Sequence, residues 1–277
     1  MVALLVLASA ALHAAWNLLA RRHGRAREAT TLFLAGSVVL SVPAALALSG
    51  PGWARAAPWG FAAGFGEAAY FVTLARALEI GPLGPVYTIS RGGSMLLVWP
   101  ASHWLLGESV GWRAAGAVLA LLVGLALLAP EGEGRGTTSR QGYLWALACG
   151  LCIAAFQLVY KRAVGGGAAP LQMFVISMST ALPLVLWATP EVRRTLWRSA
   201  RANPGLLAAG SVAMTASFVI ALYVLRDHGA GWVMTLRNSS IGFAAVFGWT
   251  FLGERPSRRA GAGVALVLAD ALLLGSA

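Results

Sequence analysis

Two arginines, Arg91 and Arg237, occupy equivalent places in two apolar stretches of the chain. They are 146 residues apart, as are Glu108 and Glu254, which follow the two stretches. A guanidinium can bind a carboxylate or phosphonate through two parallel hydrogen bonds. Inside a membrane span an ionisable group is costly unless it faces protein or water. The two arginines therefore predict a site for a small organic anion. The alternative is that each only ties its helix to a nearby carboxylate or to backbone carbonyls.

Glu67 supplies the opposite charge in the apolar stretch that precedes Arg91. At 1.5 Å per helical residue, Arg91 and Arg237 lie roughly 10 to 12 Å deep in their stretches, and Glu67 lies at a similar depth. A carboxylate beside two guanidiniums could receive the ammonium of a zwitterion such as an amino acid or an aminophosphonate. The alternative is a permanent structural pair between Glu67 and Arg91 or Arg76.

The first apolar stretch also carries candidate site residues. His13, Trp16 and Asn17 share one face of the expected helix. A histidine changes its charge near physiological pH, so His13 is a candidate for proton coupling. A lone intramembrane histidine can also be a hydrogen-bonded packing residue. The predicted substrate site includes three further residues: Tyr87, Gln157 and Asn238.

The composition indicates that these residues lie in membrane-spanning helices. The chain is 58% hydrophobic and 11% charged, against about a quarter charged in soluble domains. Windows of about 20 apolar residues, long enough to cross the ~30 Å core of a bilayer, predict an all-α polytopic protein with ten transmembrane helices. The expected spans are 2–20, 28–48, 58–79, 83–106, 111–129, 142–162, 168–188, 205–225, 230–252 and 258–275.

The halves of the chain resemble each other: residues 14–21 align with 154–161, and the two arginine stretches align as described. We expect a first five-helix repeat at 1–130, a linker at 131–141 and a second repeat at 142–277. Five spans is an odd number, so the second repeat must enter the membrane from the opposite face. This gives an inverted repeat, in which substrates bind near the midplane at the repeat interface.

Glycines and prolines predict local features of the bundle. Pro82, Pro85 and the pair Gly92–Gly93 indicate a break in the helix near Arg91, which is tolerated only where the backbone faces protein or water. Gly60 and Gly64 would let a neighbouring helix approach closely. The stretch 189–204 is predicted to be a polar connection.

The net charge of +11 comes from arginines between the apolar stretches rather than from a nucleic-acid surface. Thirteen basic residues follow odd-numbered spans and five follow even-numbered spans, which places the odd connections in the cytoplasm and both termini outside. Cys149 and Cys152 lie in an apolar stretch with no histidine nearby, so they are interpreted as small core residues. We expect no metal, no cofactor and no nucleic-acid partner.

The chain resembles the EamA family of the drug/metabolite transporter superfamily. The resemblance is carried by the two repeats, by His13 to Asn17 in the first helix, and by the Leu-Gly-Glu sequences at Leu106–Glu108 and Leu252–Glu254. It implies a central cavity between helices 1 to 4 and 6 to 9, with helices 5 and 10 behind them, where a homodimer could form. Relatives usually have cytoplasmic termini, in contrast to the charge count.

These observations predict a secondary active transporter, in a bacterial cytoplasmic membrane, that moves a small anionic or zwitterionic metabolite by alternating access. A coupling proton or a counter-substrate would drive it. The alternative is an exporter of hydrophobic or cationic compounds centred on Glu67. An enzyme is not expected, because His13 and His103 have no nucleophile motif around them.

Overall fold

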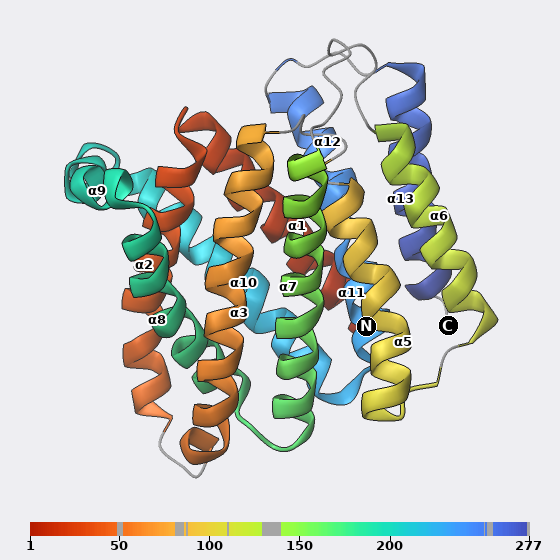
Figure 1. Cartoon of the computed structure of the whole chain (residues 1–277), viewed down its shortest axis with the longest axis horizontal. Helices are drawn as coiled ribbons and strands as arrows, with labels where there is room; N and C mark the ends of the chain where they lie inside the picture. Colours follow the sequence, from red (N-terminus) through yellow and green to blue (C-terminus); the bar gives the residue numbers. More distant parts are fainter. Residues whose placement is uncertain are drawn as a thin grey trace.

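The computed structural model describes residues 1–48, 52–80, 86, 88–109, 111–128, 140–251, 253 and 257–275. Every regular element in these ranges is helical, which confirms the all-α class (Figure 1). The first half contains α1 (Val2–Arg22), α2 (Ala26–Ala47), α3 (Gly52–Ile80), η1 (Thr88–Gly92), α5 (Gly93–Leu106) and α6 (Trp112–Leu128). The second half contains α7 (Arg140–Gly165), α8 (Pro170–Ala188), α9 (Pro190–Ala202), α10 (Pro204–Asp227), α11 (Ala230–Arg237), α12 (Ser240–Phe251) and α13 (Arg258–Gly275).

Five of these helices, α1, α2, α7, α8 and α10, are long and apolar enough to cross a membrane. They fit a polytopic membrane protein, whereas the count of ten spans stays a prediction. Two expected spans are each built from two pieces, η1 with α5 and α11 with α12. Helix α3 has 29 residues but is not among the five.

Proline and glycine set several helix ends. Pro170, Pro190 and Pro204 occupy the first turn of α8, α9 and α10, where the missing N–H would have no helical partner and the fixed φ suits the helix. Gly107 and Gly253 have φ of 70° and 68°, a left-handed conformation that glycine adopts without steric cost. The glycine of each Leu-Gly-Glu sequence is therefore required by its backbone conformation.

The expected polar connection at 189–204 contains a 13-residue helix, α9, which was not predicted. Its apolar Val192, Leu196 and Ala200 recur at helical spacing and pack on the bundle, which a reading of the segment as merely polar overlooks. Helix α7 begins at Arg140, so the predicted linker 131–141 ends in helix. The rest of that linker lies outside the described residues.

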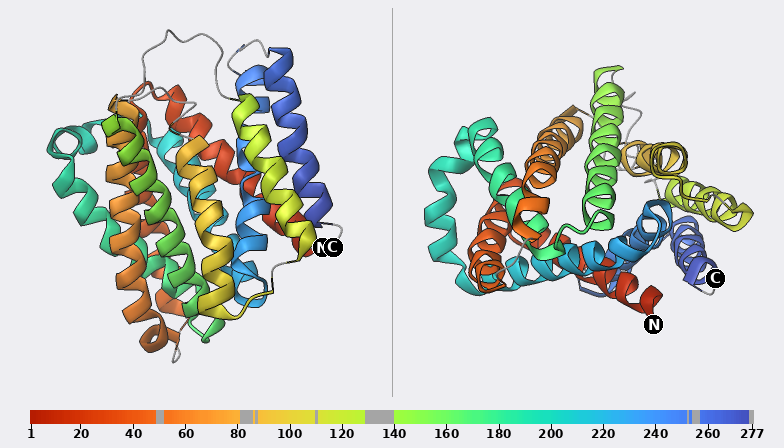
Figure 2. Two further views of the ribbon diagram at one scale, coloured as in Figure 1. Left: turned by 45° about the vertical axis from the view of Figure 1, so that its right-hand side comes forward. Right: turned by 90° about the horizontal axis from the view of Figure 1, so that it is seen from below.

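The two halves are interleaved. Helix α3 packs against α7 and α8, while α10 packs against α1 and α2. Likewise α5 contacts α7 and α12 contacts α1, and the last helices of the halves, α6 and α13, pack on each other. Such reciprocal contacts are typical of two repeats related by a two-fold axis. The division at 1–130 and 142–277 stays a prediction. Helix α1 begins and α13 ends at the same end of the bundle (Figure 2).

The predicted close approach at Gly60 and Gly64 is confirmed. A Cβ at Gly60 would lie 2.6 Å from Ile176, and one at Gly64 would lie 2.6 Å from the Ser177 carbonyl oxygen. Both contacts are with α8. Without a hydrophobic driving force between helices in lipid, such contacts supply much of the association energy.

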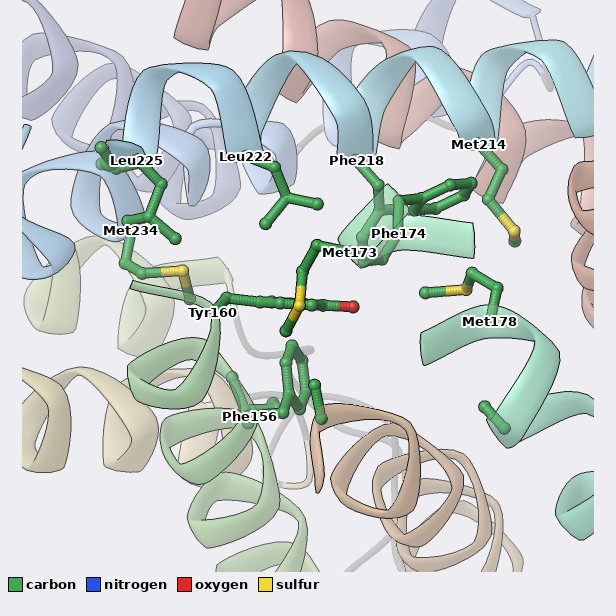
Figure 3. Close-up of a cluster of buried hydrophobic side chains, with 14 of the residues drawn as sticks. Phe156, Tyr160, Met173, Phe174, Met178, Met214, Phe218, Leu222, Leu225 and Met234 are labelled. Atoms are coloured by element: carbon green, nitrogen blue, oxygen red, sulfur yellow. The ribbon is translucent and has the colours of Figure 1, made fainter. Parts of the chain in front are cut away.

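One part of the core lies between α7, α8, α10 and α11 (Figure 3). It is rich in methionine, with Met173, Met178 and Met214 almost fully buried. Phe156 packs edge-on against Tyr160 with ring centroids 5.8 Å apart. Methionine is flexible and fills irregular gaps, which lets this core enclose polar groups carried by the same helices.

We predict that Gly64→Ala lowers the thermal stability of the protein in detergent, because its Cβ would overlap α8. Overpacking of this kind costs about 1–3 kcal/mol. The matched control is Gly116→Ala in α6, whose Cβ would meet nothing within 4 Å. Equal melting temperatures for the two variants would contradict the close packing of α3 on α8.

Candidate functional site

Both arginine segments have irregular backbone at the arginine. Arg91 lies in η1, a π-helical turn that ends at Gly92. Arg237 is the last residue of α11, and Asn238 and Ser239 form a turn before α12 begins. The break predicted at Gly92–Gly93 thus takes the form of a widened turn, while Pro82 and Pro85 lie outside the described residues. The break after Arg237 was not predicted.

The two segments pack against one another. Trp99 of α5 donates its indole N–H to the hydroxyl of Thr235 in α11 at 3.1 Å. Thr235 in turn donates to the Gly231 carbonyl at 2.8 Å. Gly231 lies against the Trp99 ring, where a Cβ would overlap it. These contacts fix the fourth helical stretch of one half on its counterpart in the other.

His13 connects the two arginines. Its Nε2 is 3.3 Å from Nη2 of Arg91, and it lies within electrostatic range of Arg237 as well. Trp16 packs edge-on against the imidazole at 4.9 Å between centroids. Nδ1 of His13 is buried without a hydrogen-bond partner. His13 and Arg237 both pack on Phe218, 6.1 and 4.5 Å from its ring centroid, so three basic side chains from α1, η1 and α11 lie near one another inside the bundle.

Arg237 is 8% exposed and has few partners. Its Nη2 donates to the Ser217 hydroxyl at 3.4 Å, and its guanidinium stacks over the Phe218 ring at 4.5 Å. Its Nε has no hydrogen-bond partner. Cation–π contact compensates part of the lost hydration of a buried guanidinium, but it leaves a donor available.

Glu67 is 1% exposed and held by one strong hydrogen bond. The Tyr160 hydroxyl donates to its Oε1 at 2.6 Å and also lies 2.6 Å from the Ser177 hydroxyl. The second carboxylate oxygen, Oε2, has no partner. Arg237 lies within electrostatic range of Glu67, but within the described residues no ion pair joins them.

This arrangement argues against the purely structural explanations of the charges. Neither Arg91 nor Arg237 is paired with a carboxylate in the part of the chain that the structure describes, and Glu67 is bonded to Tyr160 rather than to Arg91 or Arg76. Buried polar atoms nearly always find partners. Nδ1 of His13, Nε of Arg237 and Oε2 of Glu67 are thus unused groups that a polar ligand could bind.

The other predicted residues divide into two groups. Asn238 is 2% exposed with an unpaired Nδ2, beside Arg237. Trp16 is buried, and its indole N–H has no partner. Gln157 is buried on α7, one turn before Tyr160. By contrast, the Asn17 amide donates to the His13 carbonyl at 2.7 Å and so serves its own helix. Tyr87 lies outside the described residues.

Sequence reasoning missed Tyr160, Ser177 and Ser217, which bind Glu67 and Arg237. Tyr160 falls in the stretch 154–161 that aligns with 14–21, so a tyrosine within a repeated apolar segment was the available signal. The serines carried none, because serine is common in membrane helices. Ser217 also exchanges hydrogen bonds with Ser9 of α1, at 2.6 and 2.9 Å.

Glu108, the acid of the first Leu-Gly-Glu sequence, holds the start of α11. Both of its carboxylate oxygens accept the Ala230 N–H, at 2.9 and 2.8 Å. Lys161 approaches Glu108 at 3.8 Å and donates to the carbonyls of Leu225 and His228 at the end of α10. A carboxylate at a helix start and a cation at a helix end both interact favourably with the helix dipole. This clamp joins the halves on the side where α1 begins (Figure 2).

Comparison with known proteins gives the family. Residues 140–276 match the EamA-like transporter family. The chain belongs to this family through its second half. One crystal structure, titled only as the crystal structure of a protein, matches with a TM-score of 0.78 at 17% identity, covering 99% of this chain and 98% of that chain. At that identity the likeness shows the fold alone. No match is found among curated proteins.

The family and the apolar helices together show a multi-pass membrane transporter of the drug/metabolite type. The polar groups gathered inside this EamA-like protein lie on α1, α3, η1, α7, α10 and α11, so both halves contribute to them. In a carrier, a site built from both halves changes when one half moves relative to the other.

We predict that Tyr160→Phe destabilises this EamA-like transporter by about 1–3 kcal/mol, since it leaves Glu67 and Ser177 without their shared partner in the interior. Thermal unfolding in detergent measures the change. Tyr143→Phe on the same helix is the matched control, because Tyr143 is 43% exposed. In the double variant with Glu67→Gln the two effects should not add. Additive effects would mean that the hydrogen bond contributes nothing.

Proposed function

We propose that the protein is a secondary active carrier of a small organic anion or zwitterion, bound between Arg91 and Arg237 and moved by alternating access across a bacterial cytoplasmic membrane. One observation carries the proposal: two guanidiniums from equivalent segments of the two halves lie near His13, Arg91 in direct contact and Arg237 on the shared Phe218 ring, without a carboxylate partner in the described chain. Uncompensated cations in a low-dielectric interior attract an anion strongly.

The anionic group of the substrate would lie near Arg237. Unpaired donors there are Nε of Arg237 and Nδ2 of Asn238, and the hydroxyl of Ser239 is also without a partner. Helix α12 starts directly after them, so the positive end of its dipole adds to the same field. Discontinuous helices place their positive ends at anionic substrate groups in this manner in other carriers.

The cationic group of a zwitterion would lie near Glu67. Its free Oε2 is buried, and the hydroxyl of Tyr160, whose ring packs on Phe156, is bonded to the other carboxylate oxygen. An ammonium would gain both a charge-assisted hydrogen bond and contact with aromatic faces. The aminocarboxylate or aminophosphonate class therefore uses more of the unpaired groups than a simple anion does.

Alternating access requires one end of the site to open at a time. The clamp of Glu108, Lys161 and the start of α11 closes the side on which α1 begins. The charge count predicts that this side faces the outside of the cell. We assign proton coupling to His13, which contacts Arg91. A counter-substrate is the alternative driving force. We place a homodimer contact on α6 and α13.

Removal of either guanidinium should weaken substrate binding strongly. We expect Arg91→Gln and Arg237→Gln to weaken binding about 30-fold or more, since loss of one charge-assisted partner costs at least about 2 kcal/mol. A thermal-shift screen of amino acids, aminophosphonates and organic acids measures this, because a ligand at a hundredfold excess over Kd raises stability by about 2.7 kcal/mol.

Arg162→Gln at the exposed end of α7 is the matched control, and the unliganded melting temperature of each variant shows whether it is folded. Arg237→Lys keeps the charge but loses the planar fork, so we expect partial binding. The proposal fails if the folded Gln variants bind and transport the same anion as wild type.

A second candidate function is the export of hydrophobic or cationic compounds. It is favoured by the burial of Glu67 beside Tyr160, which belongs to an aromatic cluster: the ring centroids of Tyr70 and Tyr160 both lie within 6 Å of that of Phe156. A lipophilic cation could bind there through the carboxylate and ring faces alone.

Glu67→Gln separates the two functions. If the arginines bind the substrate anion, the variant keeps affinity for organic acids and loses the preference for zwitterions. If Glu67 is the centre, the variant loses lipophilic cations entirely, while Arg91→Gln leaves them unaffected. Stabilisation by lipophilic cations and by no anion would overturn the arginine-centred carrier.

A further inference from the structure

Helix α9 presents a basic face that the transport site does not use. Its 13 residues include Arg193, Arg194, Arg198 and Arg201, all exposed. Three of them follow each other at helical spacing, 194, 198 and 201, and so lie along one side. The sole acid of the helix, Glu191, is paired with Arg27 of α2 at 3.2 Å. The outward face is therefore strongly cationic.

The opposite face fixes α9 to the bundle. Val192 is buried, and Leu196 and Ala200 pack on the core. The Ser199 hydroxyl donates to Glu28 at the start of α2, and the Arg27–Glu191 pair adds a second link to that helix. Because the apolar side of α9 packs on the bundle, the exposed arginines on its other side face away from the protein.

Two tryptophans give the depth of α9 relative to the bilayer. Trp187 is 79% exposed in the last turn of α8, an apolar helix long enough to span a membrane. Trp197 on α9 is 69% exposed, and the guanidinium of Arg201 lies 4.6 Å from its ring centroid. Exposed tryptophans concentrate at the headgroup level of membranes. Helix α9 starts two residues after α8 ends and lies at the edge of the bundle (Figures 1 and 2).

We propose that α9 lies on the membrane surface and binds the headgroups of anionic phospholipids through Arg193, Arg194, Arg198 and Arg201. The charge of the face, the neighbouring interfacial tryptophans and the end of a membrane helix beside it favour lipid over a soluble acidic protein. Each arginine near an anionic leaflet strengthens the attraction roughly fivefold. The inference is independent of which substrate the transporter carries.

The test uses the full chain in nanodiscs that contain phosphatidylcholine with or without phosphatidylglycerol. Lipids brominated near the headgroup quench nearby tryptophans, and the difference between wild type and Trp197→Phe isolates the signal of Trp197. We expect its quenching to increase with the fraction of phosphatidylglycerol and to decrease severalfold at high salt, since salt screens exposed charges.

Charge-matched variants identify the arginines. The triple variant Arg194→Gln, Arg198→Gln, Arg201→Gln should lose the dependence on phosphatidylglycerol, and the corresponding triple Lys variant should keep it. A control triple at the opposite end of the bundle, Arg55→Gln, Arg162→Gln, Arg226→Gln, removes the same charge and should also keep it. Equal melting temperatures of the variants in neutral nanodiscs exclude unfolding as the cause.

Two results would overturn the proposal. In one, aqueous iodide quenches Trp197 and brominated lipid does not, which would place α9 in water and available to a soluble partner. In the other, lipid quenches Trp197 equally with and without phosphatidylglycerol and equally in the triple Gln variant, which would show an interfacial helix that does not recognise anionic headgroups.

Discussion

The gathering of three basic side chains inside a membrane bundle, with His13 and Arg237 buried and Arg91 partly buried, is the constraint on which the rest of this structure depends. A guanidinium within an apolar span is tolerated only where it faces protein or water, and here the neighbouring protein groups come from both halves of the chain. Arg91 approaches His13 on α1, whereas Arg237 approaches Ser217 and Phe218 on α10. The halves must interleave for this to happen, and the reciprocal packing of α3 and α10 is the form that interleaving takes.

The irregular backbone at each arginine follows from the same constraint. A π-helical turn at Arg91 and a turn after Arg237 redirect the side chains, and such irregular backbone persists in membranes only where it is covered by protein. Gly150 of α7 provides that cover for η1, because a Cβ there would lie 2.9 Å from the Ser90 carbonyl oxygen. In each half the irregular backbone lies next to the arginine and is followed by regular helix, α5 in the first half and α12 in the second.

Much of the fold was readable from the sequence because its strongest signal, the length of an apolar stretch, is local. The ends of α1, α2, α8 and α10 fall within a few residues of the predicted spans. Two features were not predicted, because neither leaves a clear local signal in the sequence. Helix α9 was not predicted within the polar connection because its apolar residues are few, and they become a buried face only when α2 and α8 lie beside them. The break after Arg237 has no glycine or proline to announce it.

The sequence by itself determined that the chain is helical and apolar, that it has matching halves, and that Arg91, Arg237, Glu67 and His13 are among the ionisable residues inside apolar stretches. Hydropathy and repeat spacing require no knowledge of contacts. The tertiary structure alone decided the partners: that Glu67 is bonded to Tyr160 instead of an arginine, that His13 contacts Arg91, and that Glu108 holds the start of α11. Each of these contacts joins residues at least 78 positions apart, and only the packing of helices brings such residues together.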